Sequence, residues 1–156
     1  TNLYSLVISS LEDKKIKNLS QRASFVLADA PCTGSGTFGQ FPHLKWKLTR
    51  RMLAEYKANQ NEILNKAASC VAKGGSLVYA TCSIFEEEND TVTEEFLKRN
   101  DDFDSVGWKS CFSVRVRKEL APWLEESGSG GALLYSSPVS KYSFYFHKFV
   151  RKGKFS

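Results

Sequence analysis

The sequence predicts an α/β fold built on a parallel sheet, and three neighbouring segments lead to that expectation. Residues 25–28 form a short apolar run that is typical of a strand, and residues 76–79 form a second one. Between them, residues 49–72 carry apolar side chains at the 3.6-residue spacing of a helix. A strand–helix–strand connection of this kind is parallel and right-handed in nearly all known sheets.

The segment around which the chain is organised runs from Phe25 through a glycine-rich turn to Gly36. Its apolar residues are consecutive rather than alternating, so we expect this strand to be buried on both faces. Thr49 is placed to cap the long helix at its N-terminus. The pair Gly74-Gly75 is expected to terminate that helix.

The rest of the chain alternates between predicted strands and helices. Strands are predicted at residues 3–8, 112–116 and 142–150, and a helical turn at residues 119–124. A helix is predicted at residues 86–99, where Ser83 and Glu86 resemble a capping box. The glycine-rich residues 127–131 are expected to form a flexible loop.

Length and composition place the chain among single-domain globular proteins. Its 156 residues suit one domain, and 42% of them are hydrophobic and 25% charged. No apolar run approaches the roughly 20 residues that a membrane-spanning helix needs, so no membrane partner is expected. The chain begins at Thr1 rather than at methionine, which favours a fragment or a processed product.

The net charge of +5 is unevenly distributed. Nine of the 17 acidic residues fall between Glu86 and Asp104. Basic residues gather in two clusters that also contain aromatic side chains: Lys45, Lys47, Arg50, Arg51 and Lys57 with Trp46 and Tyr56, and Lys141, Lys148, Arg151, Lys152 and Lys154 with Tyr142, Phe144, Phe146 and Phe149. Such clusters suit a polyanion such as RNA, although two solvated faces have the same pattern.

The cysteines are candidates for chemistry rather than for metal or disulfide sites. The four show no C-x-x-C spacing and the chain has two histidines, so no metal site is expected. A disulfide framework is not expected in a chain of this intracellular character. Cys32 and Cys82 each follow a predicted strand, where ligands bind in open α/β sheets. If the two strands are neighbours, both thiols lie in one crevice.

Cys82 also precedes a predicted helix, and a thiol in that position has a lowered pKa and becomes a nucleophile. Cys70 and Cys111 are interpreted as structural.

Two other features bear on the same site. Residues 34–39 match the dinucleotide-binding pattern G-x-G-x-x-G, but residues 41–43 intervene before any helix, so a dinucleotide site is not favoured. Trp46 has two open interpretations, stacking on a base or burial under the long helix.

Four groups of residues, in this order and spacing, resemble the RsmB/NSUN-type (Sun family) RNA cytosine-5 methyltransferases. They are residues 29–36 (D-A-P-C-T-G-S-G), 42–46 (P-H-L-K-W), 74–83 with its G-G and Y-A-T-C-S, and 87–89 (E-E-N). The resemblance is close over residues 25–100 and weaker elsewhere. It implies the C-terminal portion of a Rossmann-like, S-adenosylmethionine-dependent methyltransferase sheet. It also implies an RNA partner, with rRNA favoured over tRNA, and a cytoplasmic location.

The resemblance implies roles for individual residues. Cys82 would be the nucleophile that adds to C6 of a cytosine before the methyl group reaches C5, and Cys32 would act in product release. Asp29 would bind the cytosine edge, and Asp29 and Pro31 would contact S-adenosylmethionine. The RNA contacts would come from Thr33, Gly34, Lys45, Arg50 and Arg51.

The glycine-rich donor loop of that family would lie upstream of Thr1. We therefore expect residues 1–156 to be a single partial catalytic domain that is inactive in isolation. It is expected either to self-associate through an exposed sheet edge or to rely on upstream sequence for its stability. The alternative is a non-catalytic RNA-binding or scaffolding domain derived from the same fold. A thiol hydrolase is disfavoured because His43 is the only histidine near the strand ends. The presence of Cys32, Cys82 and Asp29 favours the enzyme, since a scaffold needs none of them.

Overall fold

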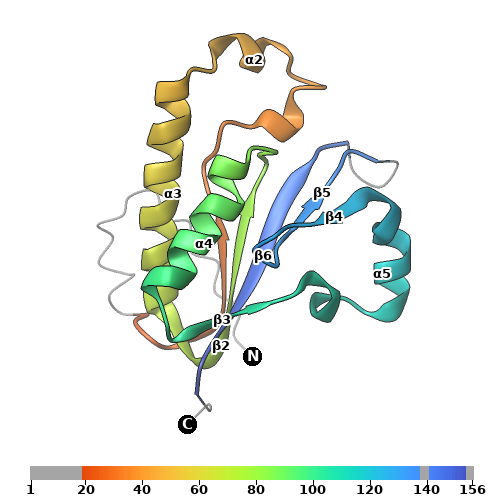
Figure 1. Ribbon diagram of the computed structural model, residues 1–156. Helices are drawn as coiled ribbons and strands as arrows, with labels where there is room; N and C mark the ends of the chain where they lie inside the picture. The colour runs from red at the N-terminus through yellow and green to blue at the C-terminus, as the bar shows by residue number, and fades with distance from the viewer. Residues whose placement is uncertain (1–18, 138–140, 154–156) are drawn as a thin grey trace.

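The computed structural model describes residues 19–137 and 141–153. In this part of the chain a six-stranded sheet has the order β1-β2-β6-β5-β4, and β3 also pairs with β6. Strands β1 (Ala23–Asp29) and β2 (Val71–Thr81) are parallel, whereas β6 (Phe144–Arg151) runs antiparallel to β2 (Figure 1). The predicted α/β sheet and its parallel strand pair are confirmed. The strand predicted at residues 3–8 lies outside the described residues.

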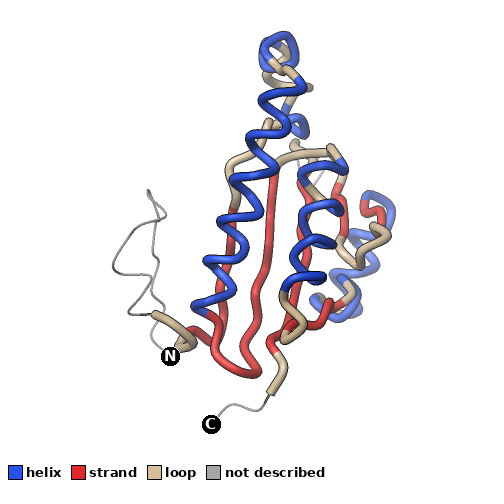
Figure 2. The backbone as a smooth tube through the Cα atoms, turned by 60° about the vertical axis from the view of Figure 1, so that its left-hand side comes forward, coloured by secondary structure: helices blue, strands red, loops and turns tan. Residues whose placement is uncertain are grey.

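Two helices cover one face of this sheet, as Figures 1 and 2 both show. Helix α3 (Arg50–Cys70) connects β1 to β2, and α4 (Asp90–Arg99) lies beside it. The Thr49 side chain accepts a hydrogen bond from the Met52 amide, so the predicted N-cap is confirmed. The core between the helices and the sheet is formed by apolar side chains, among them Leu64, Val71, Leu77, Tyr79, Val92, Phe96 and Phe149.

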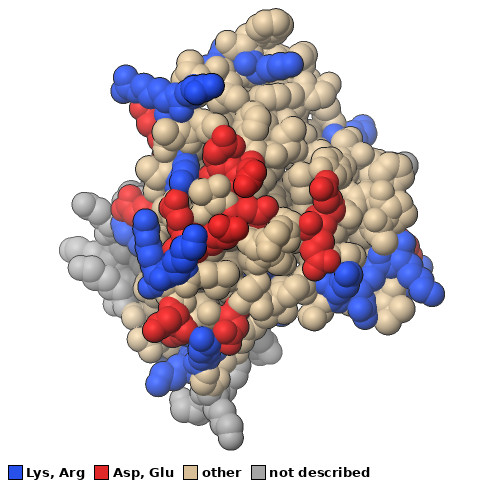
Figure 3. Space-filling view, viewed as in Figure 1, with Lys and Arg blue, Asp and Glu red and all other residues tan. Residues whose placement is uncertain are grey.

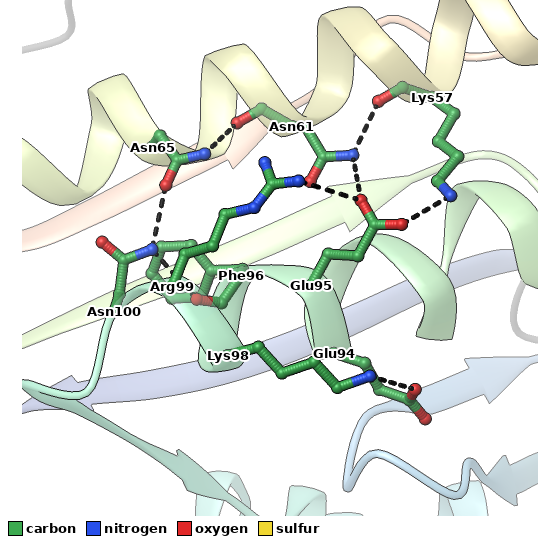
Figure 4. A network of polar contacts seen from close by, with 9 residues as sticks. All are labelled: Lys57, Asn61, Asn65, Glu94, Glu95, Phe96, Lys98, Arg99 and Asn100. Atoms are coloured by element: carbon green, nitrogen blue, oxygen red, sulfur yellow. Dashed lines mark hydrogen bonds and ion pairs between the residues drawn. The ribbon is translucent and has the colours of Figure 1, made fainter.

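A row of polar contacts fixes α3 against α4 (Figure 4). Glu95 accepts a hydrogen bond from Asn61 Nδ2 at 3.1 Å and pairs with Lys57 Nζ at 2.6 Å. The hydrogen bond from Lys57 lowers the pKa of Glu95. Near the other end of α4, Asn100 Nδ2 donates to Asn65 Oδ1 at 2.9 Å. The middle and the C-terminal end of α4 are therefore tied to α3.

Strand β1 differs from the expectation that it is buried on both faces. Phe25 is 59% exposed and Leu27 58% exposed, whereas Ala28 on the other face is buried. The physical reason is its position, because in the described chain β1 pairs only with β2 and is covered by α3 on one side. The prediction that β1 is buried on both faces is therefore wrong for the described part of the chain.

The end of α3 also differs from the prediction. The helix ends at Cys70 and β2 begins at Val71, so Gly74-Gly75 lies within the strand and not at the helix terminus. The register against β1 shifts at this point, and Gly74 has a φ of 76°. A Cβ on Gly75 would lie 2.9 Å from the Ala72 carbonyl oxygen. The glycines therefore permit an irregularity in the strand.

The segment that follows β2 contains two further differences. Residues Glu86–Glu88 form a short 3₁₀ turn, and α4 begins only at Asp90. The predicted capping box is wrong, because Ser83 Oγ accepts from the Phe85 amide and donates to Glu88 rather than meeting Glu86. Val92 and Phe96 of α4 are buried.

The C-terminal part forms an antiparallel extension of the sheet. It consists of β3 (Phe103–Val106), α5 (Val114–Leu120), β4 (Leu124–Glu126), β5 (Ala132–Leu134) and β6. The predicted strand at residues 112–116 is wrong, since Ser113 caps α5 there. A 3₁₀ turn at Ala121–Trp123 and a loop between β4 and β5 match the expectations for residues 119–124 and 127–131. No described helix has the length and apolar character to cross a membrane.

Candidate active site

The two cysteine-bearing loops meet at the C-terminal ends of β1 and β2. These strands run in parallel with Asp29 opposite Ala80, so both chains leave the sheet at the same edge. The Sγ atoms of Cys32 and Cys82 lie 3.0 Å apart, and both thiols are free. The convergence predicted from the strand ends is therefore observed.

The pKa values of the two thiols are shifted in opposite directions. The hydrogen bond from Cys32 lowers the pKa of Cys82 to about 7, although burial and the charge of Asp29 act in the other direction. The same hydrogen bond, together with burial, raises the pKa of Cys32 far above its usual range. Cys32 thus keeps its proton and donates it in a hydrogen bond to Cys82 Sγ, while a large share of Cys82 is in the thiolate form near neutral pH. A thiolate is the nucleophilic form of cysteine.

A buried carboxylate, Glu88, connects the two loops. Its Oε1 accepts from the Thr33 amide at 2.9 Å and from Gln60 Nε2 at 2.9 Å. Its Oε2 accepts from Thr33 Oγ1 at 2.5 Å and from Ser83 Oγ at 2.5 Å. Glu88 is fully buried, so these four donors replace the water that the carboxylate has lost. The residues that follow Cys32 and Cys82 in the chain are thereby held by one side chain.

A second set of contacts fixes the glycine turn after Cys32. Ser35 Oγ lies 3.0 Å from Ser83 Oγ and accepts from the Ile84 amide at 2.9 Å. The Gly36 amide donates to the Cys82 carbonyl oxygen at 2.9 Å. A Cβ on Gly36 would lie 2.1 Å from the Ser143 carbonyl oxygen, so only glycine allows this approach.

The base of the site is equally constrained. Tyr79 OH donates to the Glu88 carbonyl oxygen at 2.7 Å, and Thr81 Oγ1 donates to Asn89 Oδ1 at 2.7 Å. Asn89 Nδ2 donates in turn to the Ser83 carbonyl oxygen at 2.9 Å. The loop that carries Cys82 is therefore bonded to the strand below it and to the segment that starts α4.

The chain matches known proteins over most of this region. The sequence profile of the family described as 16S rRNA methyltransferase RsmB/F matches residues 2–121. The chain belongs to this RsmB/F family. The resemblance found in the sequence is thereby confirmed.

Individual relatives agree with this assignment. The ribosomal RNA small subunit methyltransferase B of Thermus thermophilus is 43% identical over 97 residues, which are 62% of this chain and 24% of that protein. A solved methyltransferase homologue from Pyrococcus horikoshii is 27% identical with a TM-score of 0.62, covering 87% of this chain and 41% of that one. NSun6 from the same organism, 20% identical with a TM-score of 0.63, covers 96% and 35% and supports the fold. The chain thus spans about a quarter of the length of the curated relative.

The structure places the other predicted site residues of this RsmB/F chain in two regions. Asp29 and Pro31 are exposed beside the cysteines, and Gly34 takes a left-handed conformation with a φ of 69°. Both donors of Thr33 are directed to Glu88. The predicted basic contacts lie together in and just after the short helix α2 (His43–Lys47), where Lys45, Arg50 and Arg51 are exposed. Trp46 is not buried under α3 but is 86% exposed.

Sequence reasoning missed Glu88 and Gln60 as organisers of the RsmB/F site. In the sequence, Glu88 enters only as part of the E-E-N group at residues 87–89. Gln60 offers a signal, because it lies four residues before the buried Leu64 and therefore on the apolar face of α3. A polar side chain at such a position requires a buried partner, and here Gln60 Nε2 donates to both Glu88 and the Pro31 carbonyl oxygen.

Replacing Glu88 with alanine is expected to lower the free energy of unfolding by about 3 kcal/mol, because it leaves several buried donors without an acceptor. Urea denaturation of the chain followed by circular dichroism measures this change. Glu87→Ala is the matched control, since Glu87 is the exposed neighbour and surface changes cost within about 0.5 kcal/mol. Equal stability of the two variants would show that Glu88 does not connect the loops energetically.

Proposed function

We propose that this chain is the catalytic portion of an RNA cytosine-5 methyltransferase in which Cys82 is the nucleophile. The observation that carries the proposal is the 3.0 Å contact between Cys32 and Cys82 at two adjacent parallel strand ends. Addition to a cytosine ring needs one thiolate. A second thiol that keeps its proton and contacts this thiolate suits a step that follows addition. A scaffolding domain has no need for either thiol or for the carboxylate that positions their loops.

Cytosine C5 is a poor nucleophile until a soft nucleophile has added at C6. The Cys82 thiolate forms a sulfur–carbon bond at C6, and the displaced electron pair is shared between C5 and the N3 side of the ring. A proton taken up from water at N3 neutralises that charge, and the Asp29 carboxylate, beside Cys82, accepts a hydrogen bond from the N3–H group. C5 then takes the methyl group. Water accepts the proton that C5 loses and, on release, the proton at N3. The electron pair left on C5 restores the double bond to C6 while the bond to Cys82 breaks, the step assigned to Cys32.

The proposed methyl donor is S-adenosylmethionine, which supplies an electrophilic methyl group when it is bound. Two features of the described residues fit contact with it. Asp29 ends β1 with an exposed side chain, and its charge acts on Cys82. Pro31, also exposed, has its carbonyl oxygen held by Gln60 at 2.9 Å. These residues form one side of a donor site, so we propose that residues 1–156 make up a single, partial catalytic domain.

The proposed substrate is RNA, with rRNA favoured by the names of the relatives, and the proposed location is the cytoplasm. Thr33 and Gly34 lie next to Cys32 and are proposed to border the target base. Lys45, Arg50 and Arg51 are proposed to bind phosphates, since cations that neutralise a nucleic-acid backbone release its bound counterions.

The direct test is nucleoside analysis of RNA after incubation with S-adenosylmethionine and a protein that joins this chain to a donor-binding part. Formation of 5-methylcytidine is expected, whereas methylation elsewhere would refute the proposal.

Residues 1–156 alone are expected to bind S-adenosylmethionine negligibly, and either to self-associate or to rely on upstream sequence for stability. In the described chain β1 has one hydrogen-bonded neighbour, and Phe25 and Leu27 are exposed along it. An apolar strand with a free edge pairs readily with another copy. Calorimetric titration with the donor and light scattering of the purified chain test the two parts. Tight donor binding by a monomer would contradict both.

A further inference from the structure

Helix α2 carries Trp46, whose side chain is exposed to solvent. Trp46 is 86% exposed, well above the 59% of Phe25. Tryptophan is highly buried on average in folded proteins, so exposure on this scale is unusual for the residue type. Phe41, just before the helix, is also exposed, and its ring meets His43 edge-on at 6.2 Å.

The surroundings of Trp46 are strongly basic. Residues 40–51 contain Lys45, Lys47, Arg50 and Arg51 and no acidic residue. Arg51 pairs with Glu55 at 2.8 Å, whereas no ion pair from the described residues reaches the other three. Figure 3 shows Lys and Arg side chains over the end of the molecule where α2 lies, and acidic side chains mainly over α4 and β4.

This combination fits a nucleic-acid strand better than a protein surface. Lysines precede and follow Trp46 directly, so charged side chains flank the exposed ring. The core of a protein–protein interface is depleted of charged residues. A single nucleic-acid strand needs flat rings on which its bases stack and cations along its phosphates, and both are present here.

The position of α2 relates this surface to the cysteine loops. The side chain of Leu44, two residues before Trp46, lies 3.8 Å from the place that a Cβ on Gly34 would occupy. The Phe41 amide also donates to the Thr37 carbonyl oxygen at 2.9 Å. The helix therefore rests on the turn that follows Cys32. A base that is extruded for chemistry leaves its neighbours without a stacking partner.

We infer that Trp46 stacks on an unpaired base beside the target nucleotide, while Lys45, Lys47 and Arg50 contact the adjacent phosphates. The RNA segment bound here is therefore single-stranded. This inference rests on the proposed function and adds the form of RNA that the site takes.

The test compares binding of a short labelled RNA, single-stranded or annealed to its complement, by fluorescence anisotropy of the 156-residue chain. Trp46→Ala is expected to weaken single-strand binding roughly tenfold and to leave duplex binding and the salt dependence unchanged. Trp46→Phe keeps a ring and is expected to retain most of the affinity. Trp123→Ala is the matched control, because Trp123 is 37% exposed and lies beyond α5.

A variant with Lys45, Arg50 and Arg51 changed to glutamate provides the contrast. It is expected to weaken both RNA forms and to flatten the dependence on salt, because it removes phosphate contacts. Equal single-strand affinity of Trp46→Ala and Trp123→Ala would overturn the stacking inference, as would an equal loss for duplex RNA. Either result leaves the methyltransferase proposal standing if Cys82-dependent methylation persists. Absence of that methylation would count against the proposed function instead.

Discussion

Replacing Cys82 with alanine, in a protein that joins this chain to a donor-binding part, is expected to abolish methyl transfer to RNA. The loss should be roughly 10⁴-fold or more, because without a sulfur–carbon bond at C6 no electron density reaches C5. Transfer of a labelled methyl group from S-adenosylmethionine to RNA measures the effect. RNA affinity should change little, since Cys82 is one half-buried side chain at the strand end.

The control for this experiment is Cys111→Ala. Cys111 is also half-buried, but it lies in the 3₁₀ turn Trp108–Cys111, and burial raises the pKa of its thiol. It is expected to retain full turnover. Wild-type turnover in the Cys82 variant would remove this residue from the mechanism, whatever the control shows.

Cys32→Ala is expected to stop the reaction after methyl transfer. The first bond, between Cys82 and C6, needs only one thiol, whereas release is the step assigned to the second. The protein should then remain bonded to its RNA, and a denaturing gel should show a slowly migrating protein–RNA band that Cys32→Ala,Cys82→Ala lacks.

Normal turnover of the Cys32 variant without such a band would assign Cys32 to structure alone. A band in the double variant would also contradict the account, because it would mean that another group bonds to the RNA. The two cysteine variants together therefore distinguish addition from release.

The parts of the site that the sequence predicts are those that depend on local pattern. Strand ends after residues 28 and 79 and a helix between them are enough to bring Cys32 and Cys82 together, because a parallel crossover puts both ends at one edge of the sheet. The Thr49 cap is a local feature as well. Each of these features can be predicted from residues that lie close together in the sequence.

The parts that the sequence does not predict depend on distant contacts. Glu88 meets Thr33 and Gln60, which are 55 and 28 residues away along the chain, and no local pattern reports such a pairing. The exposure of Phe25 depends on what covers the sheet and not on the strand itself. At residues 112–116 a helix starts where a strand is predicted, because the Ser113 side chain caps α5 and helix-forming residues follow.

The central claim is that Cys82 is a thiolate because Cys32 donates a hydrogen bond to it. Its most direct test is the pH dependence of alkylation by iodoacetamide, followed for each cysteine by peptide mass spectrometry on the 156-residue chain. The reaction of Cys82 should rise with a midpoint near pH 7, Cys32 should remain unreactive there, and Cys32→Ala should move the Cys82 midpoint upward. Equal reactivity of the two thiols, with a common midpoint near the ordinary cysteine pKa of about 8.5, would contradict the account.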